Sequence, residues 1–246
     1  MKYLFFLCSL LFSFSFMPDN FKSQQQKFSR VSSAYKEKEM LIKELFSSKG
    51  IELSSASVFI RAFKKEKDLE VWARATGTKK YTLIKTYKIC ASSGSLGPKR
   101  KQGDGQVPEG FYEIDRFNPS SNFYLSLGLN YPNASDKIIG KGNLGGDIFI
   151  HGDCVTIGCM PLTDDKIKEV YLMAVEVRSN GQKRIPVHVF PCRMDAKGMS
   201  YLEDKFSEDA DLLSFWKNIK EGFDRFESSS DLPEISVGKK GEYLFK

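Results

Sequence analysis

The sequence is poor in the residues that build metal centres and disulfide scaffolds. It contains only two histidines and five cysteines among 246 residues. One group, made of His151, Asp153, Cys154 and Cys159, could hold zinc, because imidazole and thiolates are ligands that this ion prefers. The sequence offers no second group of this kind. A zinc-stabilised exported domain is therefore kept only as an alternative, and we expect no metal and no other cofactor.

A long basic tract and an apolar run long enough to span a membrane are also missing. The apolar run over residues 3–17 is shorter than the roughly 20 residues that a spanning helix needs. It predicts a signal peptide over residues 1–17, or an uncleaved membrane anchor, and therefore an exported, periplasmic protein. The most basic short run, Lys99-Arg100-Lys101, is too short for a nucleic-acid-binding tract. Export also removes nucleic acid from the expected partners.

The remaining composition is that of a soluble globular protein. Hydrophobic residues make up 41% and charged residues 28% of the chain, and the formal net charge is +6. Such a chain can bury a sizeable core. We expect four regions: a signal peptide or anchor (1–17), an N-terminal helical segment (20–54), a β-rich main domain (55–195), and a C-terminal helix and tail (196–246).

Short segments of alternating polarity predict a mainly β fold for the main domain. Turn clusters separate these segments, as in proteins built from many short strands. Together with flanking helices they predict an α+β protein whose strands form a β sandwich or a partly closed barrel. The expected strands cover residues 57–63, 69–75, 81–89, 111–116, 122–128, 147–151 and 185–190.

Three segments have the apolar spacing of amphipathic helices. The first covers residues 24–49 and ends at Gly50. The second begins at Thr163, whose side chain can cap the first turn. The third covers residues 207–227. The tail that follows Pro233 can form an edge strand or remain without regular structure.

The segment from Asp147 to Cys159 is the most informative part of the sequence. Apolar residues alternate in the run up to His151, which predicts a buried strand. Gly152 and Gly158 then bracket a tight turn that ends at Cys159. A strand that delivers a histidine, followed by a loop that returns a thiol, favours a Cys–His nucleophilic pair. A histidinium or a helix N-terminus would lower the thiol pKa from about 8.5 and favour the thiolate.

This segment resembles the signature of YkuD-type L,D-transpeptidases, cysteine enzymes that remodel bacterial peptidoglycan. More narrowly, it is similar to the YafK branch of that family, in which the histidine and the cysteine lie this close together. The resemblance covers roughly residues 55–195. Five further segments support it: Val58-Phe59-Ile60-Arg61, Ser93-Gly94-Ser95-Leu96-Gly97-Pro98-Lys99, Pro108-Glu109-Gly110-Phe111-Tyr112, Tyr131-Pro132-Asn133-Ala134 and Val187-His188-Val189-Phe190-Pro191.

The resemblance implies an acyl-enzyme mechanism on a peptidoglycan stem peptide. Cys159 would attack the carbonyl at the L-centre of meso-diaminopimelate, with His151 as general base and then general acid. The carbonyl of Gly152 would orient the imidazole. The amides of Gly158 and Cys159 are the natural donors to the oxyanion. An amine would resolve the acyl-enzyme by transpeptidation, and water would resolve it by hydrolysis.

Two positions differ from the wider family. Ile157 stands where many members have a second histidine, and Pro161 stands where they have an arginine that would hold a substrate carboxylate. The YafK branch shares these differences, and the resemblance to it implies hydrolysis that releases a peptidoglycan-linked outer-membrane lipoprotein. The implied partners are therefore peptidoglycan stem peptides and such a lipoprotein.

Residues in other segments are candidates for supporting the loop or contacting the substrate. Thr156 can support the catalytic loop through its hydroxyl. His188, flanked by valines on an alternating strand, is expected to be structural. The candidate substrate contacts are Thr156, Tyr131 and Asn133 in the cleft, and Arg61, Lys99 and Arg100 for peptide carboxylates.

The number of cysteines limits the disulfides. If Cys8 leaves with the signal peptide and Cys159 stays free, three cysteines remain and at most one disulfide can form. Cys154 is close enough to Cys159 in sequence to block it by pairing. We favour Cys90 with Cys154, because each lies at the end of an expected core strand. A catalytically silent peptidoglycan-binding domain is a further alternative, although the presence of both His151 and Cys159 argues against it.

Overall fold

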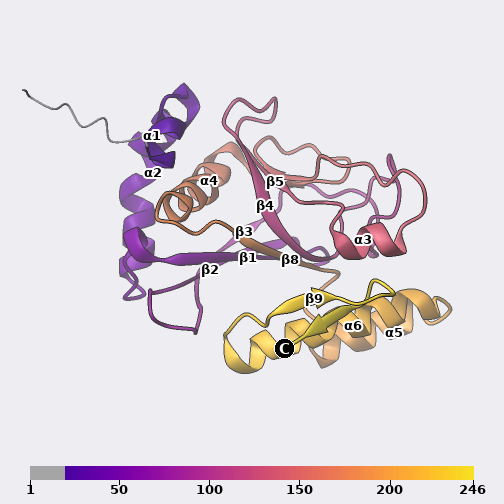
Figure 1. The fold of residues 1–246 in the computed structure, drawn as a ribbon. Coiled ribbons are helices and arrows are strands. Elements are labelled where there is room, and N and C mark those ends of the chain that lie inside the picture. Colours follow the sequence, from indigo (N-terminus) through magenta and orange to yellow (C-terminus); the bar gives the residue numbers. More distant parts are fainter. Residues whose placement is uncertain (1–19) are drawn as a thin grey trace, which may run out of the picture.

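The computed structural model of the chain describes residues 20–246, and it is built around one curled sheet of eight strands. The strands are β1 (Ser57–Phe63), β2 (Asp68–Arg74), β3 (Thr82–Lys88), β4 (Gly110–Asn118), β5 (Ser126–Leu129), β6 (Phe149–His151), β7 (Met160–Pro161) and β8 (Pro186–Phe190). Their order across the sheet is β3-β2-β1-β8-β4-β5-β6-β7 (Figure 1). The β1–β8 and β6–β7 pairs are parallel, and the other neighbours are antiparallel.

This sheet confirms the predicted α+β class. Of the two architectures left open, the strands form a partly closed, curled sheet and not two stacked sheets. Each of the seven expected strands corresponds to an observed one. The additional strand, β7, has only two residues, too few for any alternation to be visible in the sequence.

One face of the sheet is covered by three helices. These are α1 (Phe21–Gln26), α2 (Ser29–Ser47) and α4 (Asp164–Ser179). The single helix expected over residues 24–49 is thus two helices, because Phe28 takes an extended backbone conformation between them. This break lets both α1 and α2 contact α4. The side chains on this face form the larger hydrophobic core of the protein. It contains buried residues of α4 and the alternate residues Val58, Ile60 and Ala62 of β1.

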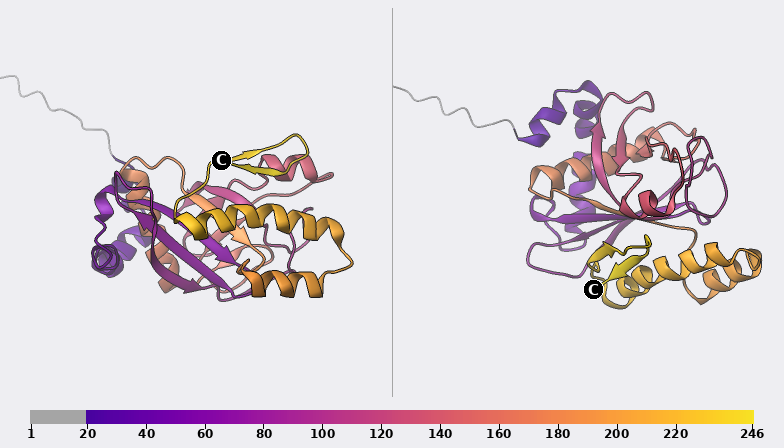
Figure 2. Two further views of the ribbon diagram at one scale, coloured as in Figure 1. Left: turned by 90° about the horizontal axis from the view of Figure 1, so that it is seen from below. Right: turned by 45° about the vertical axis from the view of Figure 1, so that its right-hand side comes forward.

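The C-terminal segment covers the opposite face of the sheet. It consists of α5 (Ala196–Lys205), α6 (Ala210–Ser229) and a hairpin of β9 (Ile235–Val237) and β10 (Tyr243–Phe245), all of which lie below the sheet in Figure 1 and in the right-hand view of Figure 2. Phe63 and Phe190 point to this side and pack with Phe223. The segment therefore closes a second core and is not a loose appendage.

A buried carboxylate joins this C-terminal unit to the sheet. Glu109 is fully buried. It accepts hydrogen bonds from the indole nitrogen of Trp216 in α6 (2.7 Å) and from the amide of Gly97 (2.8 Å). Its other close partner is the ammonium of Lys64, at 2.9 Å. A buried charge needs such a set of partners to be tolerated.

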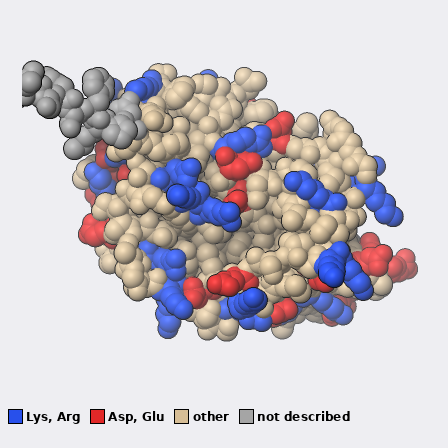
Figure 3. Space-filling view, viewed as in Figure 1, with Lys and Arg blue, Asp and Glu red and all other residues tan. Residues whose placement is uncertain are grey.

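The predicted signal peptide or anchor over residues 1–17 lies outside the described residues. Within residues 20–246, no helix combines the length and the apolar character needed to cross a membrane. On the face shown in Figure 3, Lys and Arg side chains occur in small groups next to Asp and Glu, not as one continuous basic surface.

Candidate active site

His151 lies at the end of β6 in the interior of the sheet. Its strand runs between β5 and β7, and the side chain is only 1% exposed. The Nδ1 atom is hydrogen-bonded to the carbonyl of Gly152. Because a carbonyl can only accept, Nδ1 carries the proton and Nε2 keeps its lone pair. The ring of Phe123 packs over the imidazole, with 4.7 Å between ring centroids.

Cys159 immediately precedes β7, at the end of the loop that follows His151. The hydroxyl of Thr156 organises this end of the loop. It accepts hydrogen bonds from the amides of Gly158 (3.2 Å) and Cys159 (2.8 Å), and it donates to the carbonyl of Cys159 (2.9 Å). Gly158 has φ +138°, a conformation that favours glycine, and a Cβ atom there would lie 3.0 Å from the carbonyl oxygen of Gln106.

A disulfide anchors the middle of the same loop. Cys90, which follows β3, is bonded to Cys154, and this confirms the favoured pairing. The backbone amide of Cys90 also donates to the carbonyl of Pro161 in β7. Cys159 is free and partly exposed, whereas Cys192 is free and buried. The loop is therefore tied to the sheet on both sides of the thiol.

His151 and Cys159 line one cavity of about 530 Å³, which we call the histidine-side cavity. Its other walls come from the ends of β4 and β5 and from the loop between β6 and β7. Two apolar side chains of that loop are prominent at the surface, Ile157 at 89% and Val155 at 50% exposure. The full lining is Asn118, Ser121, Asn122, Phe123, Ser126, Asp147, Phe149, His151, Val155, Thr156, Ile157 and Cys159.

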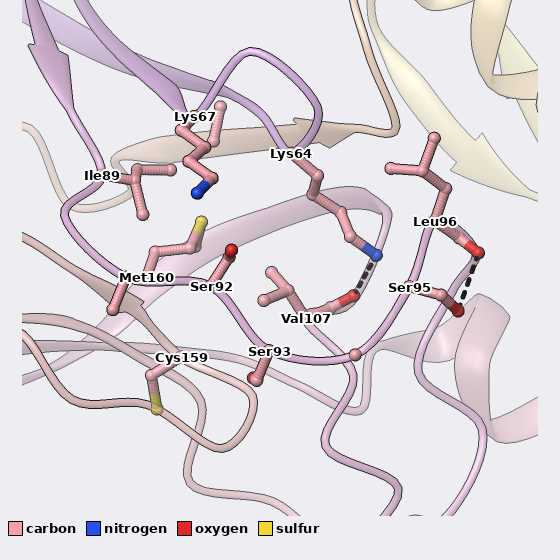
Figure 4. A pocket seen from close by; sticks show the side chains of 13 residues that line it. Lys64, Lys67, Ile89, Ser92, Ser93, Ser95, Leu96, Val107, Cys159 and Met160 are labelled. Atoms are coloured by element: carbon pink, nitrogen blue, oxygen red, sulfur yellow. Dashed lines mark hydrogen bonds between the residues drawn. The ribbon is translucent and has the colours of Figure 1, made fainter.

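A second cavity, of about 240 Å³, also reaches Cys159. Cys159 is the one lining residue that the two cavities share. This second cavity lies under the turn between β1 and β2, from which Lys64 and Lys67 extend into it (Figure 4). We call it the lysine-side cavity. The thiol therefore stands between two spaces with different walls.

Burial shifts the pKa values of both reactive groups toward their neutral forms. It lowers the pKa of His151, although the Gly152 carbonyl and the Asp153 carboxylate act in the opposite direction. It raises the pKa of the Cys159 thiol, although the Phe149 amide and the charge of Lys99 act in the opposite direction. The expected lowering of the thiol pKa is therefore wrong for the resting site. Both shifts favour the neutral forms, and the Cys159 thiol lies 3.6 Å from the carbonyl oxygen of Asp147.

The structure does not leave the expected oxyanion donors free. The amides of Gly158 and Cys159 are both engaged by the hydroxyl of Thr156. The two N–H groups thus hold the loop together in this structure. Thr156, which we also considered as a substrate contact, has its hydroxyl fully occupied by the loop.

Arg61 does not lie at either cavity. It points to the face of the sheet that α6 covers, where it is 3% exposed. Its guanidinium is bonded to Glu70 and Glu227, and it stacks on aromatic rings that include Trp72. Residues of a strand alternate between faces, so Arg61 shares its side with Phe59 and Phe63. This placement makes Arg61 part of the interface with α6 and not a substrate contact.

Tyr131 and Asn133 also have structural contacts. Tyr131 is buried, and its hydroxyl lies 3.3 Å from the carbonyl oxygens of Lys99 and Leu144. Asn133 caps the N-terminus of α3 (Ala134–Ile139) and donates to the hydroxyl of Tyr243. Neither residue lines the two cavities at Cys159. They hold the loop between β5 and β6 in place, and they do not form the cleft.

Lys99 and Arg100 are engaged in ion pairs. Lys99 is 5% exposed and pairs with Asp104, and Arg100 pairs with Asp136 at 2.9 Å.

His188 lies among the rings of Phe59 and Phe111, whose centroids are 4.8 and 4.7 Å from the centroid of the imidazole. Burial lowers its pKa to about 3, so it is a neutral core residue.

Cys154 belongs to the disulfide, so it is not a thiolate ligand for the zinc ion of the alternative reading. Within residues 20–246, no group of three or more His, Cys, Asp or Glu side chains has a metal-binding arrangement.

Two neighbours of the site were not predicted. Phe123 lies in the loop before β5, although the expected strand over residues 122–128 included it. Lys67 lies in a turn, where no periodic pattern indicates which way a side chain points.

A buried imidazole with a free Nε2 atom and a thiol on the same cavity are the two groups that a cysteine-nucleophile site requires. The family follows from comparison with known sequences. Residues 58–189 match the family model of YkuD, the L,D-transpeptidase catalytic domain. The chain belongs to this family.

Individual relatives agree with this assignment. The chain is 37% identical over 195 residues to "Putative L,D-transpeptidase YafK" of Escherichia coli K12, which covers 78% of this chain and 75% of that protein. The same values hold for the protein of that name in Escherichia coli O157:H7.

Among solved structures, the helical cell shape determining protein Pgp2 of Campylobacter jejuni has a TM-score of 0.45 and 20% identity, covering 75% of this chain and 74% of that one. Bd1075 of Bdellovibrio bacteriovorus has a TM-score of 0.41 and 18% identity, covering 74% of this chain and 76% of that one.

Proposed function

We propose that this protein is an exported cysteine enzyme that forms an acyl-enzyme at the diaminopimelate position of peptidoglycan stem peptides. The observation that carries this proposal is the cavity that the Cys159 thiol shares with the buried His151 imidazole. The family membership supports the substrate class, and both YafK relatives carry the name of an L,D-transpeptidase.

The geometry of His151 fits the role of a base that becomes an acid. Its Nδ1–H is held by Gly152, so Nε2 is free to take the proton from the Cys159 thiol. The thiolate then attacks the carbonyl carbon at the L-centre of diaminopimelate. When the tetrahedral intermediate collapses, the C–N bond breaks and the leaving amine takes the proton from His151. A thioester on Cys159 remains.

The second half of the reaction repeats the first with a new nucleophile. An amine or a water molecule gives its proton to His151, attacks the thioester carbonyl and releases the thiol. An amine gives transpeptidation, and water gives hydrolysis, which includes release of an outer-membrane lipoprotein linked to the stem peptide. The exposed apolar side chains of Ile157 and Val155 beside this cavity favour a peptide-like group on the amine side.

Two features support an exported, periplasmic location. Residues 1–17 have the pattern of a signal peptide or anchor. The Cys90–Cys154 disulfide is of a kind that persists in oxidising compartments.

The proposal is tested on purified sacculi. The protein and its Cys159→Ala variant are incubated with sacculi, and the released muropeptides are analysed by mass spectrometry. New cross-links between diaminopimelate residues indicate transpeptidation, and loss of lipoprotein remnants from tripeptides indicates hydrolysis. Products that form equally with Cys159→Ala, or no products at all, would contradict the enzyme and leave the silent binding domain.

A further inference from the structure

The two cavities that meet at Cys159 differ in charge. The lysine-side cavity is lined by two lysines and by Ser92, Ser93 and Ser95. The hydroxyls of Ser93 and Ser95 donate to the carbonyls of Gly105 and Leu96, so the hydroxyl of Ser92 is the one of the three that has no such acceptor in the described part of the chain. None of the cavity's lining residues, all within residues 20–246, is an aspartate or glutamate. The histidine-side cavity has no lysine or arginine among its lining residues, and its one acid, Asp147, is paired with Arg116 at 2.8 Å.

One of the two lysines is already neutralised. The ammonium of Lys64 lies 2.9 Å from the buried Glu109 carboxylate. It also donates to the carbonyls of Gly97 (2.7 Å) and Val107 (2.9 Å). All three donors of this ammonium are therefore used within the protein.

Lys67 is different, because its charge has no partner. No ion pair or side-chain hydrogen bond of Lys67 occurs within residues 20–246. The nearby acids are engaged elsewhere: Asp68 pairs with Lys88 and Arg193, and Glu66 accepts from the amide of Arg193.

The backbone around Lys67 fixes the position of this exposed residue at the cavity. Lys67 has a left-handed conformation with φ +55°, and its carbonyl accepts a 2.8 Å hydrogen bond from the amide of Ile89. Figure 4 shows its ammonium pointing toward Met160 and Ser92. Met160 directly follows Cys159, so the free charge is aimed at the wall that carries the nucleophile.

We propose that the lysine-side cavity binds a free carboxylate on the acyl part of the substrate, and that Lys67 is the residue that recognises it. The free ammonium of Lys67 and the hydroxyl of Ser92, in a cavity with no acid in its lining, form a space that suits an anion. This inference rests on the proposed function, and it also states how the substrate is oriented across the two cavities. The acyl part lies on the lysine side, and the leaving amine lies on the histidine side, where His151 protonates it.

A stem peptide offers two carboxylates that have this chemistry. One is on the side chain of diaminopimelate, and the other is on the γ-linked glutamyl residue. Both belong to the acyl part, so the test includes a peptide with each of them converted to a carboxamide.

Binding is measured by calorimetry in the Cys159→Ala background, which does not depend on turnover. The probes are a synthetic stem tetrapeptide with both carboxylates free and its two mono-amidated forms. Losing a charge-assisted contact to Lys67 through Lys67→Ala is expected to weaken binding of the free peptide by roughly five- to tenfold. The same substitution should leave binding of one amidated form unchanged, and that form identifies the carboxylate. Lys67→Arg should retain most of the affinity.

Lys65→Ala is the matched control. Lys65 lies in the same turn, but its ammonium packs over the ring of Tyr201 and it does not line the cavity. The Lys65→Ala variant should bind all three peptides as tightly as the background protein does. Equal weakening of all three peptides by Lys67→Ala, or no weakening, would overturn the role of Lys67 and leave the proposed function standing. Failure of the background protein to bind any of the three would refute the substrate class itself and the inference with it.

Discussion

The hydroxyl of Thr156 makes three hydrogen bonds within the loop between β6 and β7. It satisfies the amides of Gly158 and Cys159 and donates to a carbonyl. Thr156→Val keeps the shape of the side chain but leaves these groups unpaired, which costs about 1–3 kcal/mol. We expect a lower melting temperature and a fall in kcat/KM of tenfold or more.

Thr156→Ser keeps the hydroxyl and is the control for this prediction. It should retain most of the activity and stability in the same thermal-melt and kinetic assays. Full activity of Thr156→Val would show that the loop holds Cys159 without this hydroxyl.

The pKa shifts of the reactive pair predict a distinct pH dependence. Burial lowers the pKa of His151, so the imidazole stays neutral and able to accept a proton below its ordinary value of about 6.5. The acid limb of kcat/KM should therefore have its midpoint below 6.5. Burial raises the pKa of Cys159, so its alkylation by iodoacetamide should be slow at neutral pH and should still increase above pH 8.5, the usual thiol value.

Cys159→Ala gives the background for the alkylation measurement. A fast, pH-independent alkylation of Cys159 around neutrality would indicate a resting thiolate–imidazolium pair and would contradict the neutral pair.

At the scale of elements, the loop between β6 and β7 is held by one covalent link. Removing both sulfurs with Cys90→Ser and Cys154→Ser should lower the free energy of unfolding by roughly 2–4 kcal/mol. Denaturation with guanidinium chloride measures this change. The activity should also fall, because the loop that carries Cys159 loses its anchor to the end of β3.

The single variant Cys90→Ser should behave differently from the double variant. It leaves a free Cys154 thiol in the same loop as Cys159. We expect this variant to lose activity on mild oxidation and to regain it with a reductant, while the double variant is insensitive to both. If the Cys90→Ser variant keeps its activity on mild oxidation, as the double variant is expected to do, Cys154 cannot reach Cys159.

Most of the long elements were visible in the sequence, and several short ones were not. All strands of five or more residues were predicted, because apolar alternation is apparent over that length. The two-residue β7 and the six-residue α3 were missed. The ten-residue α5 was also missed, although Asp195 caps it by accepting from the amide of Gly198.

On the scale of the whole molecule, two cores share one sheet. Phe63, Phe111 and Phe190 are at most 8% exposed because the C-terminal segment covers them. A chain that ends at residue 195 would expose these rings and leave Glu109 without Trp216. We expect it to be insoluble, or to bind ANS and lack a cooperative thermal transition.

A chain that begins at residue 20 is the control, since it keeps every described contact. It should melt like the full-length protein. A soluble chain ending at residue 195 with a sharp thermal transition would show that the main domain folds without the C-terminal segment.

The sequence by itself determined the longer strands, the α+β class and the family, and it predicted the pair His151 and Cys159. These depend on local periodicity and on residues that are close together in the chain. Only the tertiary structure decided that Arg61 lies under α6, that Asn133 caps a helix and that Lys67 faces the cavity beside Cys159. The direction and partners of such side chains depend on contacts between segments far apart in the chain, and a local pattern carries no information about those contacts.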